Sequence, residues 1–112
     1  MDEEERSLIA TAAWMFALHG RRDRAKPLLE AILEETPSDG VAAGMLADIL
    51  LAEGDFARAL GVVRLARFPK ELARAEALLE TRALKGLGRG AEAASRWSRY
   101  LEAAKGAARR WV

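Results

Sequence analysis

The chain contains no cysteine, only three prolines and a single histidine among its 112 residues. Without thiols it can form neither disulfide bonds nor thiolate metal sites, and this absence suits a reducing cytoplasm. Few prolines and few β-branched residues leave little material for a sheet. His19 has no second histidine or cysteine to share a metal ion or a proton with, so the sequence predicts no metal, no cofactor and no enzyme.

The chain also lacks an excess of charge of one sign and a long apolar run. Lysine plus arginine total 18 and aspartate plus glutamate 17. A nucleic-acid-binding surface needs clustered cations, so we expect no nucleic-acid partner. No apolar run approaches the roughly 20 residues of a membrane helix, and we expect no insertion into a membrane. The first residues are acidic, the wrong sign for a secretory signal, which favours the cytoplasm.

What the chain does contain is alanine and a repeated pattern. Apolar residues make up 51%, many of them alanine, which favours closely packed helices. Four series of residues recur at a spacing of 34 positions. The series are a glycine, an alanine five residues later, a large apolar residue four positions after that, and another apolar residue four positions before the glycine. They are Gly20, Gly54 and Gly88; Ala25, Ala59 and Ala93; Leu29, Val63 and Trp97; Phe16, Leu50 and Leu84.

This spacing resembles the tetratricopeptide repeat, a helix–turn–helix unit of 34 residues. We therefore predict an all-α fold with one domain, residues 1–107, in which three repeats, residues 6–39, 40–73 and 74–107, form a short right-handed superhelix. Residues 108–112 would be a C-terminal tail. Each glycine ends a helix, and each alanine allows the two helices of a unit to approach. The predicted helices span residues 3–19 and 23–35, 38–53 and 55–67, 70–87 and 90–105.

The resemblance also implies a binding surface. In the family, the second, fifth, ninth, twelfth and thirteenth positions of each first helix line a concave side. Such a surface here would be mostly apolar, with one acid in the middle and two bases at the far end. It suits an amphipathic helix or an extended apolar segment of a protein partner. The predicted groove residues are Ser7, Ala10, Trp14, Ala17 and Leu18; Val41, Gly44, Asp48, Leu51 and Ala52; Ala75, Leu78, Arg82, Lys85 and Gly86.

Several of these residues have two interpretations from sequence. Trp14 either fills the core or anchors a partner, and Gly44 allows either close approach of a partner backbone or tight helix packing. Trp97 and Tyr100 are expected to close the core of the last helix, with a partner contact as the alternative. Trp111, in the tail, is expected to lie against another surface, since a tryptophan in a tail usually covers one.

A narrower resemblance covers most of the chain. Leu8-Ile9 and Trp14 in the first helix, Arg24-Ala25 with Leu28–Ala31 in the next, Thr36-Pro37, and Trp97–Glu102 near the end resemble the small tetratricopeptide chaperones of bacterial type III secretion, in particular the YscY type. This resemblance implies a cytoplasmic virulence chaperone that binds an early export substrate of the YscX type. It also implies a role at the periphery of the inner membrane, with the export-gate protein as a further partner.

Three alternatives stay open at this stage. The chain could serve a different secretion substrate, such as a needle or translocator protein. It could be a general interaction scaffold that self-associates, for example as a homodimer, through its uncapped last unit. An enzyme is the least favoured alternative, because residues 86–90 resemble a glycine phosphate loop yet follow a helix and lack its lysine-serine ending.

Overall fold

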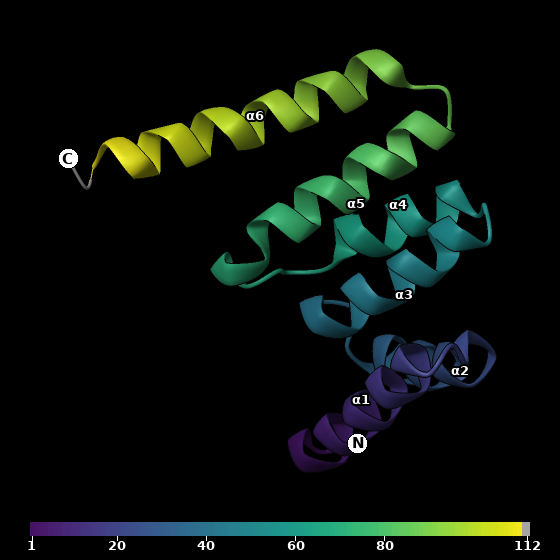
Figure 1. Cartoon of the computed structure of the whole chain (residues 1–112). Coiled ribbons are helices and arrows are strands. Elements are labelled where there is room, and N and C mark those ends of the chain that lie inside the picture. The colour runs from purple at the N-terminus through teal and green to yellow at the C-terminus, as the bar shows by residue number, and fades with distance from the viewer. Residues whose placement is uncertain (111–112) are drawn as a thin grey trace.

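In a computed structural model, residues 1–110 are described and form six α-helices arranged as three antiparallel pairs (Figure 1). We call the first helix of each pair its A helix and the second its B helix. The expected all-α fold of three helical repeats is confirmed over these residues, and Trp111 lies outside them. The helices are α1 (Glu3–Leu18) and α2 (Arg22–Glu35), α3 (Gly40–Ala52) and α4 (Phe56–Leu65), and α5 (Ala73–Gly86) and α6 (Gly90–Arg109), with a 3-10 turn, η1 (Lys70–Leu72), before α5.

The same turn closes the A helix of every unit. Gly20, Gly54 and Gly88 have φ angles of 76°, 80° and 76°, a left-handed conformation that glycine adopts without steric cost. In the first unit the amide of Gly20 donates to Ala17 and that of Arg21 to Phe16, the two hydrogen bonds of a Schellman motif. The other two turns have the corresponding bonds. The glycine period of the sequence therefore reflects one local geometry used three times.

Three aspartates begin helices in the stack. The carboxylate of Asp2 accepts a hydrogen bond from the amide of Glu5 at 2.8 Å at the start of α1. Asp39 accepts one from Ala42 at 3.0 Å, and Asp55 one from the amide of Arg58 at 3.4 Å. Each carboxylate satisfies an amide that has no partner within its helix, which stabilises a helix start by about 1 kcal/mol.

A continuous apolar core runs through the three pairs. The periodic alanines, Ala25, Ala59 and Ala93, are all buried where the two helices of a pair meet. Around them lie the largest buried side chains, each worth about 1.5–3 kcal/mol of apolar burial. These side chains are Leu29, Ile32, Leu46, Leu50, Val63 and Leu84.

Most helix boundaries lie within two residues of the predicted ones, and the differences are largest around Pro69 and at the end of α6. The helix predicted over residues 55–67 ends at Leu65, and the one predicted to begin at residue 70 begins with a 3-10 turn. The backbone is extended at Ala66 and at Pro69, and Pro69 disfavours the α conformation of Phe68 before it, so no helix bridges the two units here. At the other end α6 continues past residue 105 to Arg109, so residues 108 and 109 prolong the last helix.

The extended linker 66–69 returns against the start of α3. The amide of Arg67 donates to the carbonyl of Ser38 at 2.9 Å. This approach requires a glycine at position 40, because a Cβ at Gly40 would lie 2.5 Å from the carbonyl oxygen of Arg67. The contact places the ring of Phe68 over Gly44 on the A-helix side of the stack.

Candidate protein-binding groove

A hollow of about 620 Å³ lies between the three A helices, and we call it the groove. Helices α1, α3 and α5 each contribute residues to it, and the linker after α4 contributes to its wall. Because α2 packs against both α1 and α3 while α1 has few contacts with α3, the two A helices leave space between them. The lining residues are Ala10, Thr11, Trp14, Gly40, Val41, Gly44, Met45, Asp48, Phe68, Leu72, Ala75, Leu78, Leu79 and Arg82.

Most of the predicted groove residues meet in this hollow. The second, fifth and ninth positions of the second and third units all line it, and the fifth and ninth positions of the first unit do so as well. Eight predicted residues are thus brought together from three helices, namely Ala10, Trp14, Val41, Gly44, Asp48, Ala75, Leu78 and Arg82.

The remaining predicted residues lie elsewhere. Ser7 lines a separate shallow hollow with the acidic start of α1. The twelfth and thirteenth positions lie near the carboxyl ends of the A helices, beyond the groove. There Leu18 is exposed, Leu51 is buried in the core, and Lys85 and Gly86 border a small hollow beside Phe56. Ala17 and Ala52 also lie outside the groove. The groove therefore occupies the amino-terminal and middle parts of the A helices.

Two sets of lining residues were missed by the sequence analysis, and so was Gly40 at the first position of the second unit. Thr11, Met45 and Leu79 all occupy the sixth position of their units, so this position lines the groove in every repeat. The signal was available, because the second, sixth and ninth positions follow the i, i+4, i+7 stripe of one helix face. Phe68 and Leu72 come from the linker and η1, and no helix periodicity could place them.

The walls of the groove are apolar and accessible. Trp14 is 54% exposed, so it does not fill the core. Val41 and Leu78 are also exposed although both are large and apolar. Adjacent exposed apolar side chains of this size on a concave surface are typical of interaction sites.

One ion pair crosses the groove from α3 to α5. The guanidinium Nη1 of Arg82 lies 3.7 Å from the Oδ1 atom of Asp48, and both side chains are more than half exposed. Such an exposed pair adds little stability. Asp48 and Arg82 instead give the otherwise apolar groove a polar margin.

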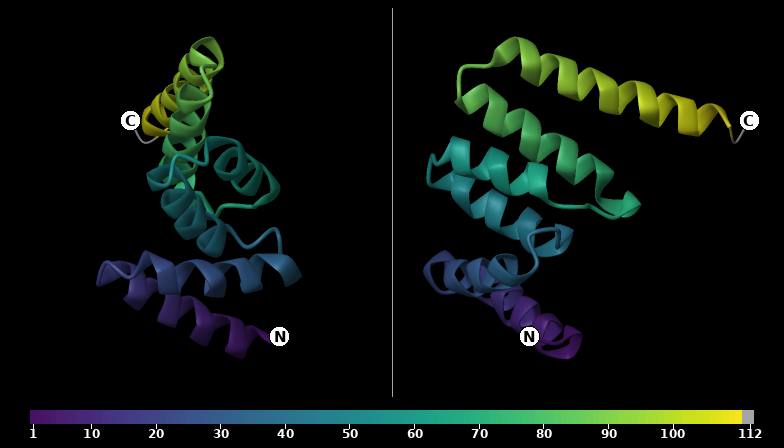
Figure 2. Two further views of the ribbon diagram at one scale, coloured as in Figure 1. Left: turned by 90° about the vertical axis from the view of Figure 1, so that its right-hand side faces the viewer. Right: turned by 180° about the vertical axis from the view of Figure 1, so that it is seen from behind.

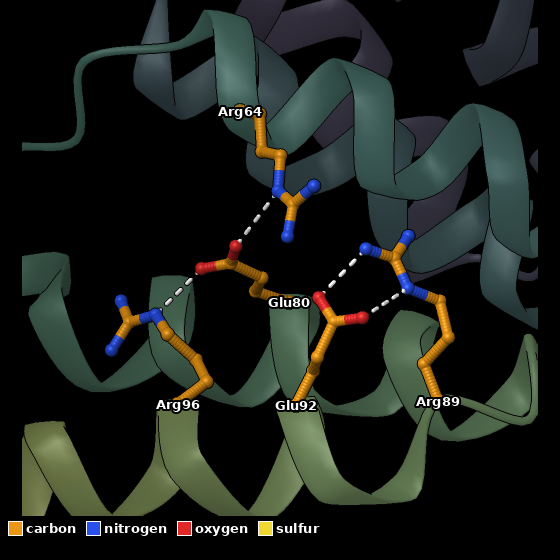
Figure 3. A network of polar contacts seen from close by, with 5 residues as sticks. All are labelled: Arg64, Glu80, Arg89, Glu92 and Arg96. Carbon is orange, nitrogen blue, oxygen red and sulfur yellow. Dashed lines mark hydrogen bonds and ion pairs between the residues drawn. The ribbon is translucent and has the colours of Figure 1, made fainter.

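On another side of α5, a charged network fixes the third A helix to its neighbours (Figure 3). The carboxylate of Glu80 accepts hydrogen bonds from Nε of Arg64 on α4 at 3.0 Å and from Nε of Arg96 on α6 at 2.5 Å. Burial alone would raise the pKa of Glu80, but the hydrogen bonds from Arg96 and then Arg64 outweigh it, so this pKa lies below its ordinary value. Close by, Arg89 binds Glu92 through two hydrogen bonds.

The described residues contain no candidate metal site. Residues 1–110 contain no group of three histidine, cysteine, aspartate or glutamate side chains that could hold a metal ion. His19 ends α1, and its Nδ1 atom lies 2.8 Å from the carbonyl oxygen of Met15. A carbonyl only accepts, so Nδ1 carries the proton in this contact. Within the same residues, none of the helices combines the length and apolarity needed to cross a bilayer.

Three stacked helix pairs with an apolar hollow on the A-helix side define a helical-repeat protein of the kind that binds other proteins. The sequence model of the tetratricopeptide repeat family matches residues 17–81, more than half of the chain. The chain belongs to the tetratricopeptide repeat family. Repeats of this family generally bind protein partners, and this chain is an interaction scaffold of that kind. No curated protein matches it.

Proposed function

We propose that the groove binds one helix of a protein partner, with the apolar face of that helix against Trp14, Val41 and Leu78. Helix-in-groove recognition needs an apolar trough with few polar groups at its margin. The observation that supports this proposal is the meeting of exposed apolar side chains from three A helices in one hollow. A tryptophan at such a place can contribute about 2–4 kcal/mol to binding.

The partner that we propose is an early export substrate of a bacterial type III secretion system, of the YscX type. The chain would act in the cytoplasm as its chaperone and help deliver it to the export gate at the inner membrane. Two considerations support this proposal. The residues that resemble the YscY type include Trp14, which lines the groove, and covering an aggregation-prone apolar helix is what a secretion chaperone must do.

The test is co-expression of the tagged chain with a candidate substrate of the YscX type. The wild-type chain is expected to purify as a stoichiometric complex. Replacing Trp14→Glu and Leu78→Glu together should abolish the complex while the helical circular dichroism stays unchanged, because both side chains are exposed. Leu65→Glu is the matched control, since Leu65 is also exposed but borders a hollow on the B-helix side.

The outcomes test two points separately: whether the groove is the binding site, and which substrate binds there. Retention of the complex by a folded Trp14→Glu/Leu78→Glu variant would exclude the groove as its binding site. If a needle or translocator protein binds in the same groove-dependent way and the YscX-type protein does not, the chaperone serves that other substrate.

A further inference from the structure

Each inner A helix uses one face to pack against the B helix before it. This face consists of the third, seventh, tenth and fourteenth positions of the unit. Two ion pairs between units show the register. Lys26 on α2 lies 2.8 Å from Glu53 at a fourteenth position, and Arg64 on α4 lies 3.0 Å from Glu80 at a seventh position. The B helix contributes its twenty-first and twenty-fifth positions to these pairs.

On α1 the same face is open, and its first three positions are apolar. Leu8 and Met15, at the third and tenth positions, are 65% and 51% exposed, and Ala12 lies between them. The corresponding residues of α3, Ala42 and Ile49, are buried. Among the described residues, no helix lies against this face of α1. We call Leu8, Ala12, Met15 and His19 the α1 face.

On α6, at the opposite end of the stack, no helix within residues 1–110 lies against the complementary face either (Figure 2). In the inner B helices, certain positions contact the A helix of the following unit. The residues of α6 at these positions are small or apolar, except in its last turns. Leu101 is 39% exposed. Trp97 stacks on Tyr100 with ring centroids 5.1 Å apart, yet it is only partly buried, whereas Leu29 and Val63 at the same repeat position are buried. We call Ala94, Ser98, Leu101 and Lys105 the α6 face.

The two faces carry opposite charges at the ends that would meet. Consecutive B and A helices in the stack run antiparallel, so the start of an added A helix lies beside the end of α6. α1 begins with three exposed glutamates, Glu3–Glu5, and α6 ends with exposed Lys105, Arg109 and Arg110. α6 has 20 residues, and its last turns project beyond α5 (Figure 1). Lys105 lies 3.6 Å from Glu102 on the same helix in an exposed pair, and Arg109 and Arg110 are exposed, so the end of α6 offers basic groups to an acidic helix start.

The register of the inner junctions brings these groups together. Extending it by one unit places Ala94 opposite His19 of a second copy and Ser98 opposite Ala12. It then places Leu101 near Leu8 of that copy. The next turn brings Lys105 to the glutamates at the start of the copy's α1. In this register Ala94 leaves room for the imidazole of His19, Ser98 meets the small Ala12, Leu101 meets the apolar Leu8, and the base meets acids.

We propose that a second copy of this chain docks head to tail, its α1 face on the α6 face of the first. The interface is heterologous, so each added copy leaves one free face at either end and the assembly can grow. The groove is formed by other positions of the A helices, so this proposal does not depend on the proposed function.

The first test measures mass against concentration for the whole chain by sedimentation velocity. The wild-type mean mass is expected to rise steadily with concentration and to pass twice the monomer mass without a plateau. Raising sodium chloride from about 50 mM to about 500 mM should reduce the association constant several-fold, because salt screens the charges. A chain that stays monomeric at every concentration overturns the proposal.

The second test blocks one face at a time. Leu8→Glu blocks the α1 face and Leu101→Glu blocks the α6 face, and both positions are exposed, so the fold should persist. Each variant alone is expected to be monomeric. An equimolar mixture should form a 1:1 complex of twice the monomer mass and grow no further, because each variant supplies the face that the other lacks.

A symmetric dimer gives a different result. If two copies pair α6 against α6, the Leu8→Glu variant still dimerises and the wild type stops at twice the monomer mass. Mixing the two variants then forms no additional complex. That pattern overturns head-to-tail docking. A second pair of variants blocks the same faces. Met15→Glu blocks the α1 face, and the double variant Lys105→Glu/Arg109→Glu blocks the basic end of α6. The charge variant should be rescued several-fold by a partner copy that carries Glu4→Lys and Glu5→Lys.

Discussion

The carboxylate of Asp48 on α3 and the guanidinium of Arg82 on α5 lie 3.7 Å apart across the groove. The sequence suggested an acid in the middle of the binding surface and two bases at its far end. In the structure the acid and one of the bases neutralise each other. A charged partner can therefore replace the contact between Asp48 and Arg82 by its own contacts with these two residues. The pair is thus better suited to selecting a partner than to stabilising the fold.

Reversing this pair tests that interpretation. The double replacement Asp48→Arg/Arg82→Asp should change the free energy of unfolding by less than about 0.5 kcal/mol, because both side chains are more than half exposed. Binding of the partner helix proposed for the groove should weaken several-fold, mainly through a slower association rate. Urea unfolding and stopped-flow binding measure the two quantities. Unchanged association would show that the pair does not contribute to recognition.

The contact between Gly86 and Phe56 gives a prediction about stability. A Cβ at Gly86 would overlap the ring of Phe56, so α5 approaches α4 as closely as it does only because position 86 is glycine. Gly86→Ala should lower the free energy of unfolding by about 1–2 kcal/mol, since overpacking outweighs the helix propensity of alanine. Urea unfolding measures it.

Two controls accompany this replacement. Gly61→Ala in the middle of α4 meets nothing within 4 Å and should instead raise stability by up to about 1 kcal/mol. In a Phe56→Ala background, the cost of Gly86→Ala should disappear. If both glycines respond alike, the contact with Phe56 is not the reason for glycine at position 86.

Gly44 on the groove wall now has a testable interpretation. A Cβ there would lie 3.5 Å from the ring of Phe68 and 4.0 Å from Leu79, which is ordinary contact. Packing within the chain therefore does not require glycine. Gly44→Ala should raise the free energy of unfolding by about 0.5–1 kcal/mol through helix propensity. It should also weaken substrate binding measured by titration calorimetry, because the methyl group fills space in the groove.

The two effects of Gly44→Ala must have opposite signs. Higher stability with unchanged affinity would show that no partner backbone comes close to α3 at this residue. Lower stability would show that the packing against Phe68 is tighter than the distances indicate.

Much of the fold followed from the period of the sequence. A left-handed turn admits glycine far more readily than other residues, and the closest approach of two helices admits only a small side chain. Both constraints are local, so Gly54 and Ala59 reveal them without knowledge of the rest of the chain. The aspartates before helices are equally local signals.

The groove was only partly predictable, because its shape depends on how units stack. Leu51 lies at a position expected on the concave side, yet it is buried in the hydrophobic core. Phe68 reaches the groove through a linker whose path depends on the proline that follows and on the missing side chain of Gly40. Neither contact has a period in the sequence, so no pattern within one repeat could show it.

The pKa of Glu80 makes the joint of the third unit sensitive to acid. Because Arg96 and Arg64 hold this pKa below its ordinary value of about 4.3, the stabilisation is complete above that pH and is lost as the pH falls through the folded pKa. Glu80→Gln should cost about 1–3 kcal/mol at pH 7, since two arginines lose a charged partner. The difference from wild type should shrink as the pH is lowered from about 5 through the folded pKa, where wild-type Glu80 also becomes neutral. Urea unfolding across this range measures it, with Glu102→Gln as the control because Glu102 belongs to an exposed pair and should change stability little at pH 7. A cost of Glu80→Gln that persists undiminished in acid would show that the shape of the side chain, and not its charge, joins α5 to α4 and α6.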